Sequence, residues 1–226
     1  MIESLRIFDN FYANPDDIVD LFKDQCTNSH ICPGNRSVEL SNIDNNLYNE
    51  IKNVLCAIHN LNPSNVKLWT YFNLHEYDPN LPHHLKRSLP HIDGDIHNHK
   101  KLTIDNYFNE MFYAGSIFMQ KNADLEAGLQ FYKEKPHKFT SREHYYKLVL
   151  EDYLLPKIKF HAGEMTAEEV NTYSENFLDH FDLVVDVKNV YNRLVTWKCG
   201  TIRSSQLITD KQKTKLIQNF YLTNVN

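Results

Sequence analysis

The sequence predicts a single domain that is mainly β and carries flanking helices. From residue 66 onward, segments rich in β-branched and aromatic residues recur, and such segments are typical of strands. Apolar residues at helical spacing occupy the first quarter of the chain and a block over residues 133–180. A length of 226 residues with 42% hydrophobic and 12% aromatic content allows one sizeable core.

Composition argues against several classes of function. The net charge of -5 supplies no global basic field, so neither nucleic acid nor an anionic membrane is expected as a partner. No run reaches the roughly 18 apolar residues of a membrane span, and the start of the chain does not resemble a secretory signal. We therefore expect a cytoplasmic protein, in the host cytoplasm if the source is viral. The 4 cysteines form no CxxC motif and are expected to be reduced thiols.

The first 62 residues are expected to form a strand and a helical cover over the core. An opening strand is predicted over residues 4–12, and Asn14-Pro15 then marks the start of a helix that runs to about Gln25. A turn at residues 33–37 precedes a second helix from Asp44 to Asn60, in which apolar residues recur at helical spacing.

Core strands are predicted over residues 63–132 and 181–226, on either side of a helical insertion at 133–180. The individual strands are expected at residues 66–74, 113–120, 128–132, 181–187, 193–198 and 216–222. A polar turn joins 113–120 to 128–132, so these two are expected to pair with each other as antiparallel neighbours. The insertion contains helical patterns at 141–155 and 166–180, and Thr166 with Glu169 predicts a capping box for the second.

One pair of residues after Pro90 has the chemistry of a metal site. If the backbone is extended there, His91 and Asp93 lie two positions apart on one face of a strand and can bind one ion. An imidazole and a carboxylate are two of the three protein ligands in the two-His-one-carboxylate site of non-haem Fe(II) oxygenases. The third ligand would be a second His from a distant strand.

Several stretches, taken in chain order, resemble the bacterial and phage 2-oxoglutarate/Fe(II)-dependent oxygenases of the prolyl-hydroxylase-like type. They are residues 7–15 for the opening strand and helix, 33–37 for the turn, 90–93 for the first metal motif, 114–119 and 128–132 for two core strands, 192–197 for the strand before the distal His, and 215–222 for the strand with the co-substrate base. The resemblance implies a double-stranded β-helix, which is a cupin-like jelly roll, with N-terminal helices and a helical insertion.

The resemblance also implies Fe(II) and 2-oxoglutarate, with His91 and Asp93 as metal ligands. Lys215 stands where these enzymes place a basic residue against the distal carboxylate of 2-oxoglutarate. Tyr71, Tyr113 and Tyr132 are candidates to donate hydroxyl hydrogen bonds to the same carboxylate. The implied reaction is oxidative decarboxylation of 2-oxoglutarate to succinate, coupled to oxidation of a small-molecule or peptide substrate that the sequence does not identify. The sequence does not indicate an oligomeric state.

The distal His is absent from its expected place. Such proteins carry it about six residues after the aromatic residue that ends the preceding strand, which here is Trp197, and that count leads to Arg203. A guanidinium has no lone pair to give to iron and stays protonated at ordinary pH. The substitute histidines that remain open are His83, His84, His97, His99, His161 and His180.

Three hypotheses follow from this substitution. In the first, the chain is an oxygenase in which His91 and Asp93 still hold iron, with the coordination completed by water, 2-oxoglutarate or another residue. In the second, the fold has lost iron, and Arg203 with Lys215 binds an anion such as a carboxylate or phosphate. In the third, the jelly roll is a structural or assembly scaffold.

Overall fold

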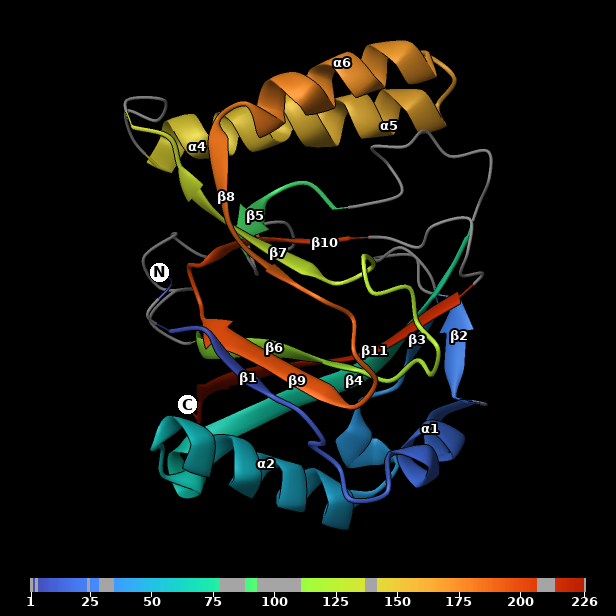
Figure 1. Cartoon of the computed structure of the whole chain (residues 1–226), viewed down its shortest axis with the longest axis vertical. Coiled ribbons are helices and arrows are strands. Elements are labelled where there is room, and N and C mark those ends of the chain that lie inside the picture. The colour runs from blue at the N-terminus through green and yellow to red at the C-terminus, as the bar shows by residue number, and fades with distance from the viewer. Residues whose placement is uncertain are drawn as a thin grey trace.

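Two antiparallel sheets lie face to face, with helices on both outer sides (Figure 1). The structure is a computed structural model and describes residues 2, 4–23, 25–28, 35–77, 88–92, 111–136, 142–206 and 214–225. Alternate residues of each core strand face the space between the sheets or the helices outside it, because successive side chains of a strand point to opposite faces. This arrangement gives each sheet an inner face and an outer face.

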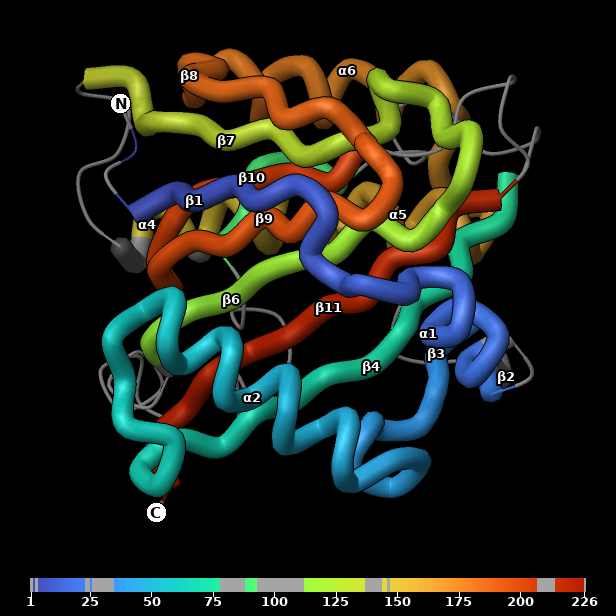
Figure 2. Tube along the Cα trace, turned by 60° about the horizontal axis from the view of Figure 1, so that its bottom comes forward, coloured from blue at the N-terminus to red at the C-terminus, as the bar shows by residue number. Residues whose placement is uncertain are grey.

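The large sheet has seven strands in the described part of the chain. In spatial order they are β1 (Arg6–Phe8), β9 (Arg193–Lys198), β6 (Met111–Phe118), β11 (Thr214–Asn224), β4 (Val66–Glu76), β3 (Asn35–Ser37) and β2 (Cys26–Asn28). The helices α1 (Pro15–Lys23) and α2 (Asn45–His59) cover its outer face, as Figure 2 shows. Short 3-10 turns at Leu40–Asn42 and Pro63–Asn65 flank α2.

The small sheet has four strands among the described residues, in the order β5 (His91–Ile92), β10 (Ile202–Ser205), β7 (Leu129–Glu134) and β8 (Phe181–Val187). A helical layer packs on its outer face. It consists of α4 (Arg142–Leu148), a π-helical segment (Val149–Leu154), α5 (Leu155–His161) and α6 (Ala167–Leu178). No helix of the described chain is long and apolar enough to span a membrane.

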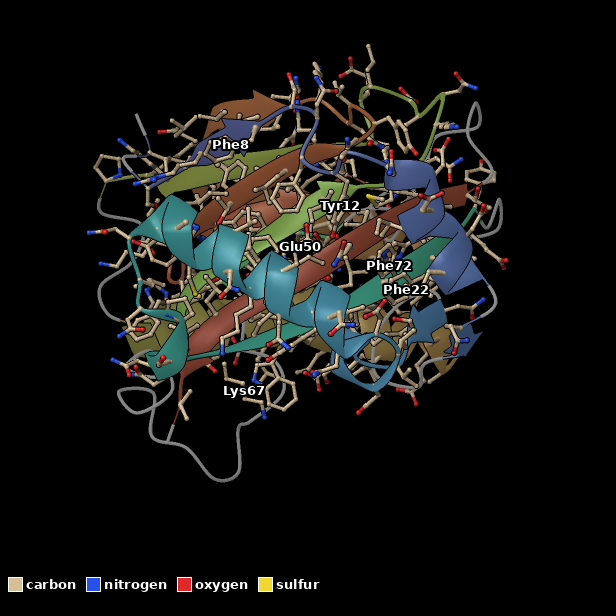
Figure 3. The ribbon with its side chains drawn as sticks, turned by 90° about the horizontal axis from the view of Figure 1, so that it is seen from below. Phe8, Tyr12, Phe22, Glu50, Lys67 and Phe72 are labelled. Carbon is tan, nitrogen blue, oxygen red and sulfur yellow. The ribbon has the colours of Figure 1, made fainter. Side chains whose placement is uncertain are left out.

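Three apolar clusters hold these layers together. The first lies between α1, α2 and the large sheet, where the rings of Phe22 and Phe72 stack with centroids 3.8 Å apart (Figure 3). The second lies between the small sheet and the helical layer and includes Phe177 and Phe181. The third fills part of the space between the sheets, where the ring of Phe131 on β7 meets the ring of Trp197 on β9 edge to face.

Contacts across the inter-sheet space fix which strands lie opposite one another. The Phe131–Trp197 contact places β7 over β9, and the hydrogen bond from Lys215 to Ser205 places β10 over β11. Because β5 is the next strand beyond β10 and β4 is the next beyond β11, β5 lies on the β4 side of the space. His91 therefore lies on the edge strand of the described small sheet, on the side that faces β4.

The mainly β fold with flanking helices agrees with the sequence prediction. The strands at 181–187 and 193–198 match β8 and β9 residue for residue, and Asp44 caps α2 by accepting hydrogen bonds from the backbone N–H groups of Asn46 and Leu47. The capping box of Thr166 and Glu169 is confirmed at the start of α6. The helix expected to end at Leu155 instead continues, through the π-helical segment, to His161.

One pairing prediction is wrong. The strands at 113–120 and 128–132 were expected to pair, but β6 pairs with β9 and β11 in the large sheet, whereas β7 pairs with β8 and β10 in the small sheet. The polar segment between them therefore crosses from one sheet to the other. Three short strands were also missed, and they are β2, β3 and β10.

Candidate functional site

The inner face of the two sheets carries a polar strip at one end. On β11, Lys215, Ile217, Asn219 and Tyr221 face inward, while the residues between them pack under α1 and α2. Ser116 of β6 also faces inward and donates a hydrogen bond to Oδ1 of Asn219 at 2.7 Å. Lys215 begins this strip and is its most deeply buried charged group.

Lys215 is fully buried, with 0% of its surface exposed. Its Nζ donates hydrogen bonds to the Gln206 backbone oxygen at 2.6 Å and to Ser205 Oγ at 3.2 Å. Burial, followed by repulsion from Arg203, lowers the pKa of Lys215 to about 7. Among the described residues no carboxylate forms an ion pair with this amine. The chain thus holds a buried amine whose positive charge is not neutralised by a described anion.

His91 and Arg203 occupy directly opposed positions on neighbouring strands. The register of β5 and β10 pairs His91 with Arg203 and Ile92 with Ile202. The two isoleucines pack into the cluster under the helical layer, so His91 and Arg203 share the inner face. The guanidinium carbon of Arg203 lies 5.1 Å from the centroid of the Trp197 ring. Arg203 therefore stands beside His91 within the inter-sheet space.

The imidazole of His91 is oriented by a backbone group. Its Nδ1 lies 2.7 Å from the carbonyl oxygen of Leu89. Because a carbonyl can only accept a hydrogen bond, Nδ1 carries the proton, and the lone pair of the neutral ring is on Nε2. This is the arrangement in which metal-binding histidines are commonly held by an outer hydrogen bond.

Arg36 adds another cation on the inner face of the large sheet, near the part that lies opposite β5. Arg36 of β3 lies with its guanidinium carbon 3.9 Å from the centroid of the Tyr71 ring and donates a hydrogen bond from Nε to Asn73 Oδ1 at 3.3 Å. His75 pairs in register with Lys215, and its pKa falls to about 4 because of burial and then the charges of Lys215 and Arg36. His75 is therefore neutral at physiological pH.

The structure brings together three of the residues expected from the sequence, and they are His91, Arg203 and Lys215. Asp93 lies outside the described residues. Tyr113 is not brought to this site: its ring stacks on His59 of α2 with centroids 3.7 Å apart, on the outer face of the large sheet. Tyr132 also faces outward, toward the helical layer, and its hydroxyl donates to Gln130 Oε1 at 2.6 Å. Of the three tyrosines, only Tyr71 faces inward.

The substitute histidines are not gathered at His91 within the described chain. His161 is exposed at the end of α5, and His180 follows α6 with its Nδ1 2.9 Å from the Asn176 carbonyl oxygen, so both belong to the helical layer. His83, His84, His97 and His99 lie outside the described residues. In the part of the chain that the structure describes, no three His, Cys, Asp or Glu side chains form a group suited to a metal.

Sequence reasoning missed Arg36, Ser205 and Gln206. Arg36 was expected in a turn, but it lies on the three-residue strand β3, which pairs with β4. Ser205 is the last residue of β10 and Gln206 follows it, and nothing in this short polar run marks it as a strand. Because side chains of a strand alternate between its two faces, predicting a strand over residues 202–206 would have placed Arg203 and Ser205 on one face.

Comparison with known families identifies the chain. Residues 2–219 match the model of a family of unknown function, DUF6445. The chain belongs to this family. No curated protein matches the sequence. The DUF6445 match covers almost the whole described core, including both sheets and the helical layer, but its description assigns no activity.

Solved structures similar to this DUF6445 chain share little sequence identity with it. A Pseudomonas putida prolyl-4-hydroxylase is 8% identical with a TM-score of 0.51, over 99% of this chain and 94% of that chain. HygX from Streptomyces hygroscopicus, with nickel and 2-oxoglutarate bound, is 10% identical with a TM-score of 0.57, over 97% and 82%. The non-haem α-ketoglutarate-dependent carbocyclase SnoK is 8% identical with a TM-score of 0.52, over 97% and 79%. These similarities establish the jelly-roll fold.

Proposed function

We propose that this chain binds 2-oxoglutarate between its two sheets and uses it as the co-substrate of an Fe(II)-dependent oxygenase. The observation that carries the proposal is the buried amine of Lys215, which has no described carboxylate partner. HygX, whose fold is similar, has been solved with 2-oxoglutarate bound. A carboxylate that enters the inter-sheet space at this point would neutralise the buried charge.

The donors of Lys215 fit one carboxylate group. A protonated amine has three N–H donors, and Ser205 Oγ and the Gln206 carbonyl oxygen accept two of them. The third has no acceptor among the described residues, so it is the donor that a bound carboxylate would use. Charge-assisted hydrogen bonds of this kind are stronger than neutral ones, and the surrounding low dielectric strengthens them further. Since Arg203 lowers the pKa of Lys215, arrival of an anion would also relieve the repulsion between these two cations.

His91 fits a metal through Nε2, because Nδ1 is occupied by the Leu89 carbonyl oxygen. Asp93 would be the second protein ligand under this proposal. Iron, when bound, would supply the oxidising chemistry, in which dioxygen takes two electrons from 2-oxoglutarate and two from the substrate. The chain's own contribution is to hold the co-substrate by Lys215, to orient His91 and to limit the access of water with the apolar cluster around Trp197.

The test measures binding and turnover separately. Calorimetry should show that 2-oxoglutarate binds the wild type and that Lys215→Met weakens this binding by about 100-fold, the loss of roughly 3 kcal/mol expected for one charged hydrogen bond. Lys198→Met, at an exposed position of β9, is the matched control and should bind as the wild type does. Succinate release with Fe(II) and ascorbate then reports the oxygenase reaction. Equal binding by both variants would contradict the proposal.

A second candidate function rests on Arg203. Its position opposite His91 places a permanent cation where the oxygenase resemblance expects a third metal ligand. In this alternative the chain binds an anion by Arg203 and Lys215 without iron. Mn(II) affinity distinguishes the two candidates: it should drop in a His91→Ala, Asp93→Ala double variant if the site holds a metal, and should not change if it does not.

Replacing Arg203 by His sharpens the distinction. If Arg203→His raises metal affinity or starts succinate release in an otherwise inactive chain, the native protein is the iron-free anion binder. If the native chain is active and the substitution abolishes turnover, Arg203 contributes to the oxygenase itself. Lys198→His, at the exposed control position, should leave metal affinity unchanged.

A further inference from the structure

The inner face of β4 continues past the Lys215 site as a row of aromatic and cationic side chains. Alternate residues of this strand face inward, and they are Lys67, Trp69, Tyr71, Asn73 and His75. Lys67 places its Nζ 3.8 Å from the centroid of the Trp69 ring, and Arg36 covers the ring of Tyr71. The Tyr71 ring in turn lies 6.3 Å from the Tyr221 ring of β11. We call Lys67, Trp69, Tyr71, Arg36 and Tyr221 the β4 platform.

The Trp69 end of the β4 platform is too far from Lys215 to serve the same ligand. Lys215 pairs with His75, and Trp69 precedes His75 by six residues, which corresponds to about 20 Å along an extended strand. A five-carbon dicarboxylate held by Lys215 does not span that length. The platform therefore suits a second molecule, bound on the β5 side of the inter-sheet space.

Exposure and charge indicate the chemistry of that molecule. Trp69 keeps 43% of its surface exposed although it is on the inner face, so its ring is accessible to a ligand. The inner-facing charged residues of β3, β4, β10 and β11 are Arg36, Lys67, Arg203 and Lys215, and all four are cationic. Among the described residues of these strands, this is a local excess of positive charge in a protein with a net charge of -5. Such a surface attracts anions, and its rings stack on flat groups.

We propose that the substrate of this chain is a small anion that carries a planar unsaturated ring, which stacks on Trp69 while Lys67 and Arg36 bind its anionic group. This inference rests on the proposed oxygenase function, since it names the substrate class of the same inter-sheet site. Two sources share this chemistry, namely aromatic carboxylates or phosphates and nucleoside monophosphates. A long polyanion does not fit as well, because the acidic remainder of the protein surface would repel its flanking parts.

Fluorescence of Trp69 provides a direct test. The chain has 2 tryptophans, and Trp197 is buried, so Trp197→Phe leaves Trp69 as the single reporter. The probes are benzoate, phenyl phosphate and adenosine 5′-monophosphate, with adenosine and benzyl alcohol as rings without charge and inorganic phosphate as a charge without a ring. Ring-bearing anions should quench Trp69 saturably and bind at least about tenfold more tightly than either control class, because stacking and charge each contribute about 1–3 kcal/mol.

Variants separate a ligand-binding role from a structural one. Lys67→Gln and Arg36→Gln should each weaken binding of the best ring-bearing anion by about tenfold, equivalent to roughly 1.4 kcal/mol, whereas Lys198→Gln should not. If Trp197→Phe does not fold, the difference in quenching between the wild type and Trp69→Phe gives the same measurement. Equal binding of all probe classes, no binding, or an equal loss in the Lys198 control would overturn the inference.

The experiment is run without metal, in the presence and absence of 2-oxoglutarate, so that its failure is distinct from failure of the oxygenase proposal. Loss of 2-oxoglutarate binding in Lys215→Met with no ring-bearing anion bound rejects the substrate class alone. Binding of the ring-bearing anion with no binding of 2-oxoglutarate rejects the co-substrate and leaves the β4 platform as a ligand site. Stimulation of succinate release by the bound anion supports both.

Discussion

The two faces of the large sheet bury polar groups in opposite ways. On the outer face, Gln218 accepts a hydrogen bond from the Tyr12 hydroxyl and donates one from Nε2 to Thr70 Oγ1 at 3.0 Å. These groups are neutral and satisfy one another. On the inner face, three residues away on the same strand, Lys215 is equally buried but is a potential cation with Arg203 nearby.

This difference separates stability from ligand binding. A neutral, mutually hydrogen-bonded network costs little to bury, whereas a buried amine next to another cation destabilises the ligand-free chain. Proteins commonly retain such destabilising groups at functional sites, because the groups are needed to bind a ligand even though they lower the stability of the ligand-free chain. The neutral network of the outer face thus stabilises the fold, whereas the Lys215 end of the inner face is where we propose that a ligand binds.

The largest expected effect on stability is on the outer face. Phe72→Ala removes a fully buried ring that stacks on Phe22 and should lower the free energy of unfolding by about 3–5 kcal/mol. Tyr71→Ala, one position along β4 on the half-buried inner face, is the matched control and should cost roughly half as much or less. Urea denaturation measures both. A larger loss in Tyr71→Ala would contradict the assignment of the two faces.

The second prediction concerns how the stability of the chain depends on pH through a histidine on the outer face. His59 of α2 is 6% exposed, its Nε2 lies 3.0 Å from Thr196 Oγ1, and no described residue forms a hydrogen bond with its Nδ1. Burial, and then the charge of Arg6, lowers the pKa of His59 to about 4. The unfolded chain binds the proton first, so stability is complete above about pH 6.5 and is lost as the pH falls toward 4.

The size of this loss is up to about 3 kcal/mol for one histidine with such a shift. Denaturation curves of the wild type and His59→Gln between pH 7 and 4 measure it. The wild type should lose more stability than the variant across this range. Parallel curves would show that His59 is not buried in its neutral form.

The third prediction is that replacing a buried polar side chain on the inner face raises the stability of the chain instead of lowering it. Lys215→Met replaces the buried amine by an apolar side chain of similar length and should raise the free energy of unfolding of the ligand-free chain by about 1–3 kcal/mol. The same variant loses the anion binding described above. Lys198→Met should change neither quantity. A destabilised Lys215→Met chain would mean that its hydrogen bonds to Ser205 and Gln206 outweigh the cost of burial.

The sequence predicted the elements better than their pairing. The strands β8 and β9 and the capped helix α2 have strong local signals: β-branched and aromatic runs, an Asp cap at 44 and a left-handed Asn at 60. The strand β10 has only four residues, two of them serines, and owes its conformation to pairing with β5 and β7. Likewise, the polar segment between β6 and β7 resembles a hairpin turn, and only tertiary packing sends the two strands to different sheets.

The candidate site was predictable in part from residue chemistry and in part from chain position. His91 was predicted from its residue type and its spacing from Asp93, whereas Arg203 and Lys215 were predicted from their positions in the oxygenase resemblance. The structure places His91 and Arg203 opposite each other and Lys215 beside Arg203. Tyr113 illustrates what residue type cannot give, because the face of β6 on which it lies depends on strand register: Ala114 faces inward and Tyr113 therefore faces α2. Ser205 and Gln206, which hold the Lys215 amine, depend on the same kind of register.

The smallest effect, and the most specific to the inner face, is the coupling of ligand binding to a proton. Lys215 is packed against Arg203 of β10, His75 of β4 and the Phe118 ring of β6, and its pKa is about 7 without ligand. A bound carboxylate raises that pKa, so above pH 7 binding of 2-oxoglutarate should take up a proton and weaken by about tenfold per pH unit, or 1.4 kcal/mol. Calorimetry in buffers with different ionisation enthalpies measures the uptake. Because His75 is neutral throughout this range and Arg203 stays charged, an affinity that does not change between pH 7 and 9 would exclude Lys215 as the proton acceptor.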